Sequence, residues 1–305
     1  MSKIIVGVDE SPGSADAVAL ASRLAGVTGA ALMLVNVYPY DVQPNRALNY
    51  EFETYLHEDS VALLERLSKA QGDTSVEVKA VPHPSPAHGL HVLAEELDAG
   101  LIVVGSTHTG RAGRVLPGST AERLFHGSPC PVAVAPKNYA HDASRELGVV
   151  GCGYDGTPAA QRALDAAHRL AAATGARLRV IRAFKPVAIV PQRGVPMGGA
   201  AYDESLRGQA SDELDAAIAG LQGDPQAERS FFIGDPAQIL AESSEELGLL
   251  ILGSRGYGPM HSVLVGGVAG RVVREAACPV IVLPRRAGHV EEDSLFAQAA
   301  PPVHG

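Results

Sequence analysis

Cysteine is scarce in this chain and occurs in no paired spacing. The three cysteines among 305 residues, Cys130, Cys152 and Cys278, lie far from one another. This usage excludes a disulfide framework and a zinc site of the CxxC type, and it favours reduced, buried thiols. Cys130 and Cys278 each precede an apolar run, so we expect their side chains to pack in a core.

The chain also lacks long apolar runs and basic segments. No stretch approaches the roughly 20 apolar residues that span a bilayer, and the N-terminus passes into the strand-like residues 4–6 without a signal peptide. We therefore expect a cytoplasmic protein without a membrane partner. The net charge of −9 and the absence of a basic run argue against nucleic acid as a partner.

What the chain does contain is an internal repeat. The segment CPVAVAP at residues 130–136 returns as CPVIVLP at 278–284, and Asp9 after one apolar run returns as Asp155 after another. Because the matched positions keep nearly the same separation, the chain is a tandem duplication. The organisation that we expect is a first domain at 1–141, a second domain at 146–286, and a disordered tail at 287–305.

Each copy alternates short β-branched runs with alanine-rich helical patterns. The runs lie at residues 3–8, 31–38, 75–81, 101–104 and 132–135, and again at 147–151, 178–184, 228–233, 249–252 and 280–283. Nearly continuous Val/Ile/Leu strands separated by helices predict a parallel sheet with both faces covered. We predict an α/β fold of two tandem, Rossmann-like, doubly wound domains, each with a five-stranded parallel sheet.

A hydroxyl and a proline open the first helical pattern of each copy, as Ser11-Pro12 and Thr157-Pro158. The hydroxyl suits an N-cap, and the proline suits the first helical turn. We therefore predict N-caps at Ser11 and Thr157.

Two features of each copy point to one ligand site. Asp9 and Asp155 end the first strands, and glycine-rich loops begin at Gly105 and Gly253, after the fourth strands. Doubly wound sheets bind ligands at the carboxyl ends of the strands, where the strand order reverses. If strands one and four are neighbours there, the acid and the loop face one cleft.

These residues resemble the universal stress protein family, specifically its tandem two-domain members. Nucleotide-binding members carry a glycine, two residues, a glycine, nine residues, and then a glycine with a serine or threonine. Gly253, Gly256 and Gly266 fit that spacing, but Gly267 stands where the hydroxyl should be.

The first copy departs from the family pattern at a different place. Gly105 and Gly118-Ser119 supply the outer glycines and the hydroxyl, but His108 replaces the second glycine. A side chain at this position could block a close approach of the backbone to phosphate, or the imidazole could itself reach a phosphate. Both readings of His108 stay open.

The resemblance implies an adenine nucleotide alpha hydrolase-like fold that binds ATP with Mg²⁺. Asp9 and Asp155 would contact the ribose, Val37 and Ala183 would line the adenine pocket, and the glycine loops would hold the phosphates. The residues expected to bind ATP are Asp9, Val37, Val104, Gly105, His108, Gly118, Ser119, Thr120, Asp155, Ala183, Leu252, Gly253, Gly256, Gly266, Gly267 and Val268. Family members pair through their last strands, so the two halves would form an intramolecular pseudo-dimer, and the chain could also form a homodimer.

Elementary chemistry agrees with such a phosphate site. Glycine lets successive backbone N–H groups converge on an anion, and a helix that begins near Thr120 would favour phosphate at its N-terminus. The Ser119 hydroxyl would add one hydrogen bond. Its loss at Gly267 should weaken binding by roughly 1 kcal/mol or less.

Plainer readings of these residues remain open. The glycine loops could be tight turns without a ligand, and Asp9 and Asp155 could be helix caps or surface carboxylates. The loops also contain Arg111, Arg114 and Arg255. We expect solvation of an arginine in such a loop more than a contact with phosphate. His83, His88 and His91 have no counterpart set in the second copy, which disfavours a metal site. The insertion at residues 186–199 could cover the second pocket or serve no such purpose.

Three functions follow in order of preference. The first is a stress-response sensor or regulator that binds ATP in one or both halves. The second is a slow ATPase or nucleotidyl transferase, disfavoured because the chain has no GxxxxGK[ST] loop and no lysine in either glycine loop. The third is a nucleotide-free dimerisation module, which the two departures from the pattern keep open.

Overall fold

The structure is a computed structural model that describes residues 2–40, 50–71, 76–107, 114–115, 117–142, 147–186, 199–254 and 267–284. The expected tail at 287–305 lies outside these residues, as does most of the insertion at 186–199. Among the helices of the described ranges, none combines the length and the apolar character needed to cross a membrane.

Strands and helices alternate through both halves, as predicted. The first half contains β1 (Lys3–Gly7), α1 (Gly13–Thr28), β2 (Ala31–Tyr38), α2 (Tyr50–Ala70), β3 (Glu77–Pro82), α3 (Pro86–Glu96), β4 (Leu101–Gly105), α4 (Ser119–Phe125) and β5 (Val132–Ala135). The second half contains β6 (Val149–Gly153), α5 (Pro158–Thr174), β7 (Arg177–Phe184), α6 (Gly199–Ala219), β8 (Ala227–Ile233), α7 (Pro236–Ser243), β9 (Leu249–Gly253), α8 (Gly267–Glu275) and β10 (Val280–Leu283).

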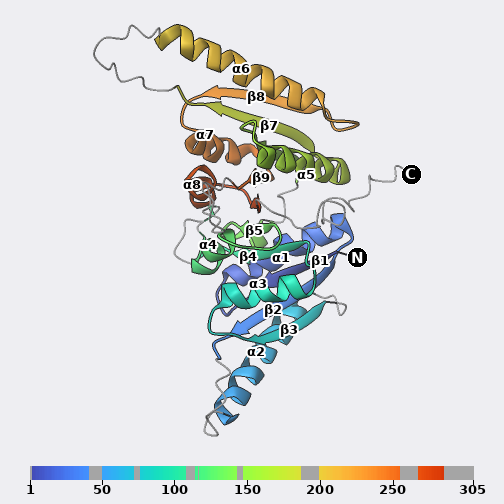
Figure 1. Ribbon diagram of the computed structural model, residues 1–305. Helices are drawn as coiled ribbons and strands as arrows, with labels where there is room; N and C mark the ends of the chain where they lie inside the picture. The colour runs from blue at the N-terminus through green and yellow to red at the C-terminus, as the bar shows by residue number, and fades with distance from the viewer. Residues whose placement is uncertain are drawn as a thin grey trace, which may run out of the picture.

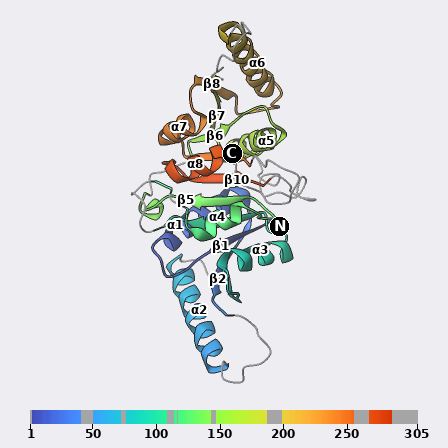
Figure 2. The same cartoon turned by 60° about the vertical axis from the view of Figure 1, so that its left-hand side comes forward.

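The strands form one sheet with the order β3-β2-β1-β4-β5-β10-β9-β6-β7-β8. Within each half all neighbours are parallel, which confirms the two predicted five-stranded doubly wound sheets. The halves meet where β5 and β10 pair antiparallel, with Ala133 opposite Ile281. The chain is therefore elongated, with β5 and β10 at its middle and α2 and α6 at its two ends (Figures 1 and 2).

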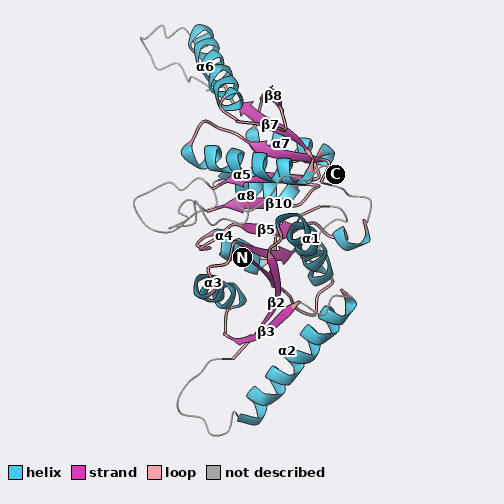
Figure 3. Ribbon diagram, turned by 90° about the vertical axis from the view of Figure 1, so that its right-hand side faces the viewer, coloured by secondary structure: helices cyan, strands magenta, loops and turns pink. Residues whose placement is uncertain are grey.

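Side chains alternate between two apolar layers along each strand. Ile4 and Val6 pack on one face of the sheet with α1, α2, α5 and α6, while Ile5 packs on the other face with α3, α4, α7 and α8. Figure 3 shows these helices on the two sides of the magenta strands. Both core clusters run through both halves, so the β5–β10 junction is buried like the rest of the core.

Polar contacts near the first glycine loop also join the halves. The Arg114 guanidinium donates to the Glu275 carbonyl at 3.0 Å and pairs with Glu245. The Val115 N–H donates to the Ala276 carbonyl at 2.8 Å. Arg114 thus binds groups of the second half. This contact supports neither of the two roles considered for Arg114, a solvated side chain or a phosphate ligand.

Only one of the two predicted N-caps is present. The Thr157 hydroxyl accepts from the Ala160 N–H at 3.2 Å, and Pro158 is the first residue of α5, as predicted. The prediction for Ser11 is wrong, because α1 begins at Gly13 with Pro12 at the cap and no side-chain capping bond. The Ser11 hydroxyl donates to the Asp9 carboxylate, as the Thr157 hydroxyl does to Asp155, so this bond does not set the halves apart. The difference is that α1 begins two residues after Ser11, whereas α5 begins directly after Thr157.

Candidate functional site

The strand order reverses where β1 and β4 lie side by side, and again where β6 and β9 do. β1 pairs with β2 on its other edge, and β6 pairs likewise with β7. Strands one and four of each half are thus neighbours, the arrangement that places a ligand crevice at their carboxyl ends. Asp9 and Asp155 follow β1 and β6 at this crevice.

A cavity of about 280 Å³ occupies the crevice of the first half. The predicted site residues that line it are Asp9, Val37, Val104, Gly105, Gly118, Ser119 and Thr120. Four hydroxyl side chains that the sequence did not single out as ligand contacts line it too: Ser11, Ser14, Ser106 and Thr107. His108 lies outside the described residues, so its role stays a prediction.

Local hydrogen bonds orient the Asp9 carboxylate. Its Oδ1 atom accepts from the Ser11 N–H at 2.9 Å and lies 2.9 Å from the Ser14 hydroxyl, which also accepts the Asp9 N–H at 2.8 Å. In the second half Asp155 Oδ1 accepts from the Thr157 N–H at 3.1 Å and from its hydroxyl at 2.6 Å. Each aspartate therefore closes a local turn and is held in place at the cavity wall.

The first glycine of each motif is required by packing. A Cβ at Gly105 would lie 2.1 Å from the Gly13 carbonyl oxygen, and one at Gly253 would lie 2.4 Å from that of Ala159. The ends of β4 and β9 thus touch the starts of α1 and α5, backbone against backbone. Any side chain here would separate strand and helix, so these glycines shape the crevice whether or not a ligand is bound.

The crevice of the second half holds a larger cavity, about 480 Å³ in volume. The predicted site residues that line it are Asp155, Ala183, Leu252, Gly253, Gly267 and Val268. Gly256 and Gly266 lie outside the described residues, as does Arg255. Five further residues with ionisable side chains line this cavity and were not predicted from the sequence: Tyr154, Arg182, Lys185, Asp235 and Arg271.

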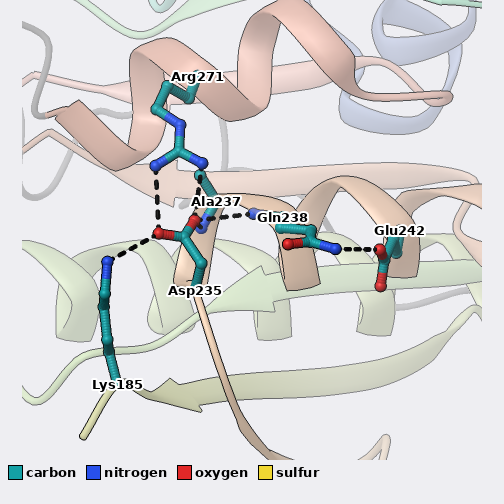
Figure 4. A network of polar contacts seen from close by, with 6 residues as sticks. All are labelled: Lys185, Asp235, Ala237, Gln238, Glu242 and Arg271. Carbon is teal, nitrogen blue, oxygen red and sulfur yellow. Dashed lines mark hydrogen bonds and ion pairs between the residues drawn. The ribbon is translucent and has the colours of Figure 1, made fainter.

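Three of these charged side chains form an ion network at the cavity (Figure 4). Asp235 Oδ1 lies 2.8 Å from one Arg271 nitrogen, while Oδ2 lies 3.2 Å from the other and 3.2 Å from Lys185 Nζ. Asp235 also caps α7 by accepting from the Ala237 and Gln238 N–H groups. The Arg271 guanidinium, and then Lys185, hold the pKa of the Asp235 carboxyl well below its ordinary value, and Asp235 in turn raises the pKa of Arg271.

A second ion pair lies deeper in the same cavity wall. Arg182 is 11% exposed at its side chain, pairs with Glu213 of α6 at 2.8 Å, and lies over the Tyr154 ring at 5.8 Å. Burial raises the pKa of Tyr154, so the phenol stays protonated at neutral pH. In the first half Asn36 takes the place of Arg182 and donates to the Val8 carbonyl at 2.8 Å.

The remaining candidate residues lie apart from both cavities. The three cysteines are buried thiols, as expected, and burial raises the pKa of Cys130 to about 12. The rings of His83, His88 and His91 lie next to one another. Within the described part of the chain, no group of three or more His, Cys, Asp or Glu side chains could hold a metal ion.

Comparison with known proteins identifies the family. The model of the universal stress protein family matches residues 1–136 and again residues 148–284. The chain belongs to the universal stress protein family. Its two matches make it a tandem member, in agreement with the repeat in the sequence.

Known universal stress proteins resemble the chain over most of its length. One from Mycolicibacterium smegmatis is 30% identical over 297 residues, which cover 93% of this chain and 97% of the relative. One from Mycobacterium tuberculosis is 33% identical over 205 residues, which cover 66% of this chain and 70% of the relative. The crystal structure of a universal stress protein from Archaeoglobus fulgidus aligns with a TM-score of 0.64 at 20% identity, covering 93% of this chain and 98% of that one. The last comparison supports the universal stress protein fold over the aligned 93% of the chain.

Proposed function

We propose that this universal stress protein binds ATP and acts as a stress-response sensor or regulator, with the second half as the tighter site. One observation carries the proposal. In each half an aspartate after the first strand and a glycine at the end of the fourth strand line a single cavity at the reversal of strand order. The same arrangement occurs twice, in halves that otherwise differ.

The second cavity has the dimensions and the surface for a nucleotide. Small-molecule sites measure about 300–1,000 Å³, and the cavity of about 480 Å³ falls within this range. Ala183 and Leu252 offer apolar surface to a base, and Asp155 offers a carboxylate to ribose hydroxyls. Gly253 and Gly267 line the cavity where the phosphates would lie. In this reading Mg²⁺ accompanies the phosphates.

Charge favours the second half over the first. The described lining of the second cavity has three basic side chains and two acids: Arg182, Lys185, Arg271, Asp155 and Asp235. The described lining of the first cavity contains no basic side chain and one acid, Asp9. Because ATP is a polyanion, basic groups around a cavity raise its local concentration and its affinity. The first cavity, at about 280 Å³, is also smaller. These differences support an alternative in which the first half binds no nucleotide and only the second half binds ATP.

The test begins with the protein as purified. After denaturation, chromatography of the supernatant should reveal adenine nucleotide, and millimolar ATP with Mg²⁺ should raise the melting temperature of nucleotide-stripped protein. GTP at the same concentration is the matched control and should have a smaller effect. Absence of both bound nucleotide and a thermal shift would overturn the proposal. ATP turnover above the buffer rate that disappears on Asp155→Ala would favour the slow enzyme instead.

A further inference from the structure

A second hollow in the first half is lined by basic side chains. It lies between α3 and α4, measures about 350 Å³, and is bordered by His88 and His91 from α3 and by Arg123 and His126 from α4. The His88 ring stacks on His91 at 5.9 Å between centroids, and His83 adds a third ring 4.7 Å from His88. We call this the α3–α4 groove. None of these residues lines the proposed nucleotide cavity.

Of the carboxylates next to the α3–α4 groove, one pairs with a residue of the groove and one with a residue outside it. Glu95 lies 3.5 Å from the His91 Nε2 atom, and Glu122 pairs with Arg274 of α8 at 2.8 Å. The His83 Nδ1 atom lies 2.9 Å from both the backbone nitrogen and the carbonyl oxygen of Ser85. The titratable and charged groups on α3 and α4 and next to them are His83, His88, His91, Glu95, Glu96, Glu122, Arg123 and His126, and Arg274 of α8 reaches Glu122. Cations outnumber carboxylates in this set once the imidazoles are protonated.

The place in the second half that corresponds to the α3–α4 groove contains a carboxylate of the protein itself. Arg271 is the fifth residue of α8, as Arg123 is the fifth residue of α4. Arg271 binds the Asp235 carboxylate with both terminal nitrogens, and the same carboxylate accepts two N–H groups from the start of α7 (Figure 4). An arginine on the last helix and the start of the preceding helix thus hold one oxyanion between them.

The first half has the cations but no carboxylate at the start of α3. Ser85 takes the position of Asp235 before the matching Pro-Ala pair, and its hydroxyl makes no capping bond to α3. His88 stands where the second half has Gln238, and His126 where it has Arg274. The first half therefore replaces a built-in anion with additional titratable cations.

We propose that the α3–α4 groove binds a phosphate-class oxyanion, and that it does so more tightly as the pH falls through the range in which imidazoles gain a proton. Guanidinium and imidazolium groups donate charge-assisted hydrogen bonds, and several donors that converge suit a tetrahedral dianion better than a single carboxylate. Imidazole changes its charge between about pH 5 and 8, so the groove is the more basic at the acid end. This proposal is independent of nucleotide binding at the crevices.

The test is a titration of the full chain in chloride buffer at constant ionic strength, with sulfate, which is a dianion at both pH values used, and with inorganic phosphate, which is mostly a monoanion at pH 6. The readout is the NMR shift of the His Cε1–H groups at pH 6 and pH 8. We expect saturable shifts of His88 and His91 at pH 6, with an affinity for sulfate roughly tenfold lower at pH 8. A parallel titration with glycerol phosphate tells whether the free ion or a phosphate monoester is preferred, and either preference fits the proposal.

Variants copied from the second half make the test specific. Ser85→Asp should place a carboxylate beside Arg123 and abolish the phosphate shifts, and as a strong N-cap residue the new aspartate suits the start of α3. His88→Gln should weaken binding roughly tenfold at pH 6, while the exposed His141→Gln is the control and should change nothing. The proposal is overturned by an absence of saturable shifts at pH 6, or by shifts that persist unchanged in both Ser85→Asp and His88→Gln.

Discussion

The two halves share their backbone plan and differ in the charges around it. Strand order, the position of the crevice, the aspartate after the first strand and the close strand–helix contact at Gly105 and Gly253 are the same in both. The second half surrounds its cavity with ion pairs from β7, α7 and α8, and the first half uses hydroxyls. Backbone geometry thus sets where a ligand can lie, and side chains that vary between the copies set which ligand it is.

The largest expected difference between the halves concerns nucleotide affinity. We predict that Asp155→Ala lowers the affinity for ATP by about ten- to a hundredfold, the range expected for loss of a hydrogen bond to a charged group. Asp9→Ala should lower it by less than about threefold, because the first cavity is smaller and lacks basic lining among its described residues. Isothermal titration calorimetry measures both.

Asp155→Asn is the control for that pair of variants. The amide oxygen can still accept from the Thr157 N–H, so the local turn is kept while the charge is removed. Equal losses in the two alanine variants, or a larger loss at Asp9, would contradict the assignment of the tighter site to the second half.

The next effect tests the feature that the halves have in common. Gly105→Ala and Gly253→Ala should each lower the free energy of unfolding by about 1–3 kcal/mol, because the new Cβ meets a carbonyl oxygen of the neighbouring helix start. Gly26→Ala in α1 and Gly208→Ala in α6 are matched controls with open space around the added atom, and helix propensity predicts that they stabilise. If chemical denaturation gives the control variants a lower free energy of unfolding than Gly105→Ala and Gly253→Ala, the packing role of Gly105 and Gly253 is refuted.

A smaller change should follow from exchanging one hydroxyl between the halves. Gly267→Ser should strengthen ATP binding up to about fivefold, which corresponds to a hydrogen bond of about 1 kcal/mol. Ser119→Gly should leave the total affinity of the chain nearly unchanged if the second half dominates. Competition titrations with a fluorescent nucleotide resolve shifts of this size, and a weaker Gly267→Ser variant would show that the site does not use the hydroxyl.

The smallest effect concerns the ion network that only the second half contains. The pKa of Asp235 is lowered in the folded protein, so its carboxylate stabilises the fold above the ordinary aspartate pKa, and this contribution is lost as the pH falls through the acid range. Asp235→Ser should therefore lower the melting temperature slightly at pH 7, and this difference should begin to shrink only below the ordinary aspartate pKa, so that most of it is still present at pH 3. Because the three groups are partly exposed, salt should reduce the difference at pH 7. A difference in melting temperature between the two proteins that grows as the pH falls toward 3 would contradict a lowered pKa for Asp235.

The fold and the position of the site follow from the sequence because both rest on repeated, local signals. Apolar strand runs, helices and the repeat predict two doubly wound sheets, and the rule for such sheets places Asp9 and Gly105 at one crevice. The Lys185–Asp235–Arg271 network could not be predicted, because it joins residues from three elements that are far apart in the sequence. The predicted N-cap at Ser11 is wrong because α1 begins two residues after its hydroxyl residue and α5 only one, and the Ser/Thr-Pro pair that both halves share does not reveal this shift.

The antiparallel pairing of β5 with β10 has a consequence for how the protein behaves in solution. Two separate domains that meet through such an edge would come apart on dilution, but here a single chain carries both strands. A tether of this kind gives an effective concentration of roughly millimolar, whatever the amount of protein present. The junction therefore stays formed when the protein is rare, and the melting temperature of this contact should not depend on protein concentration. One molecule always presents two unlike crevices in a ratio of one to one.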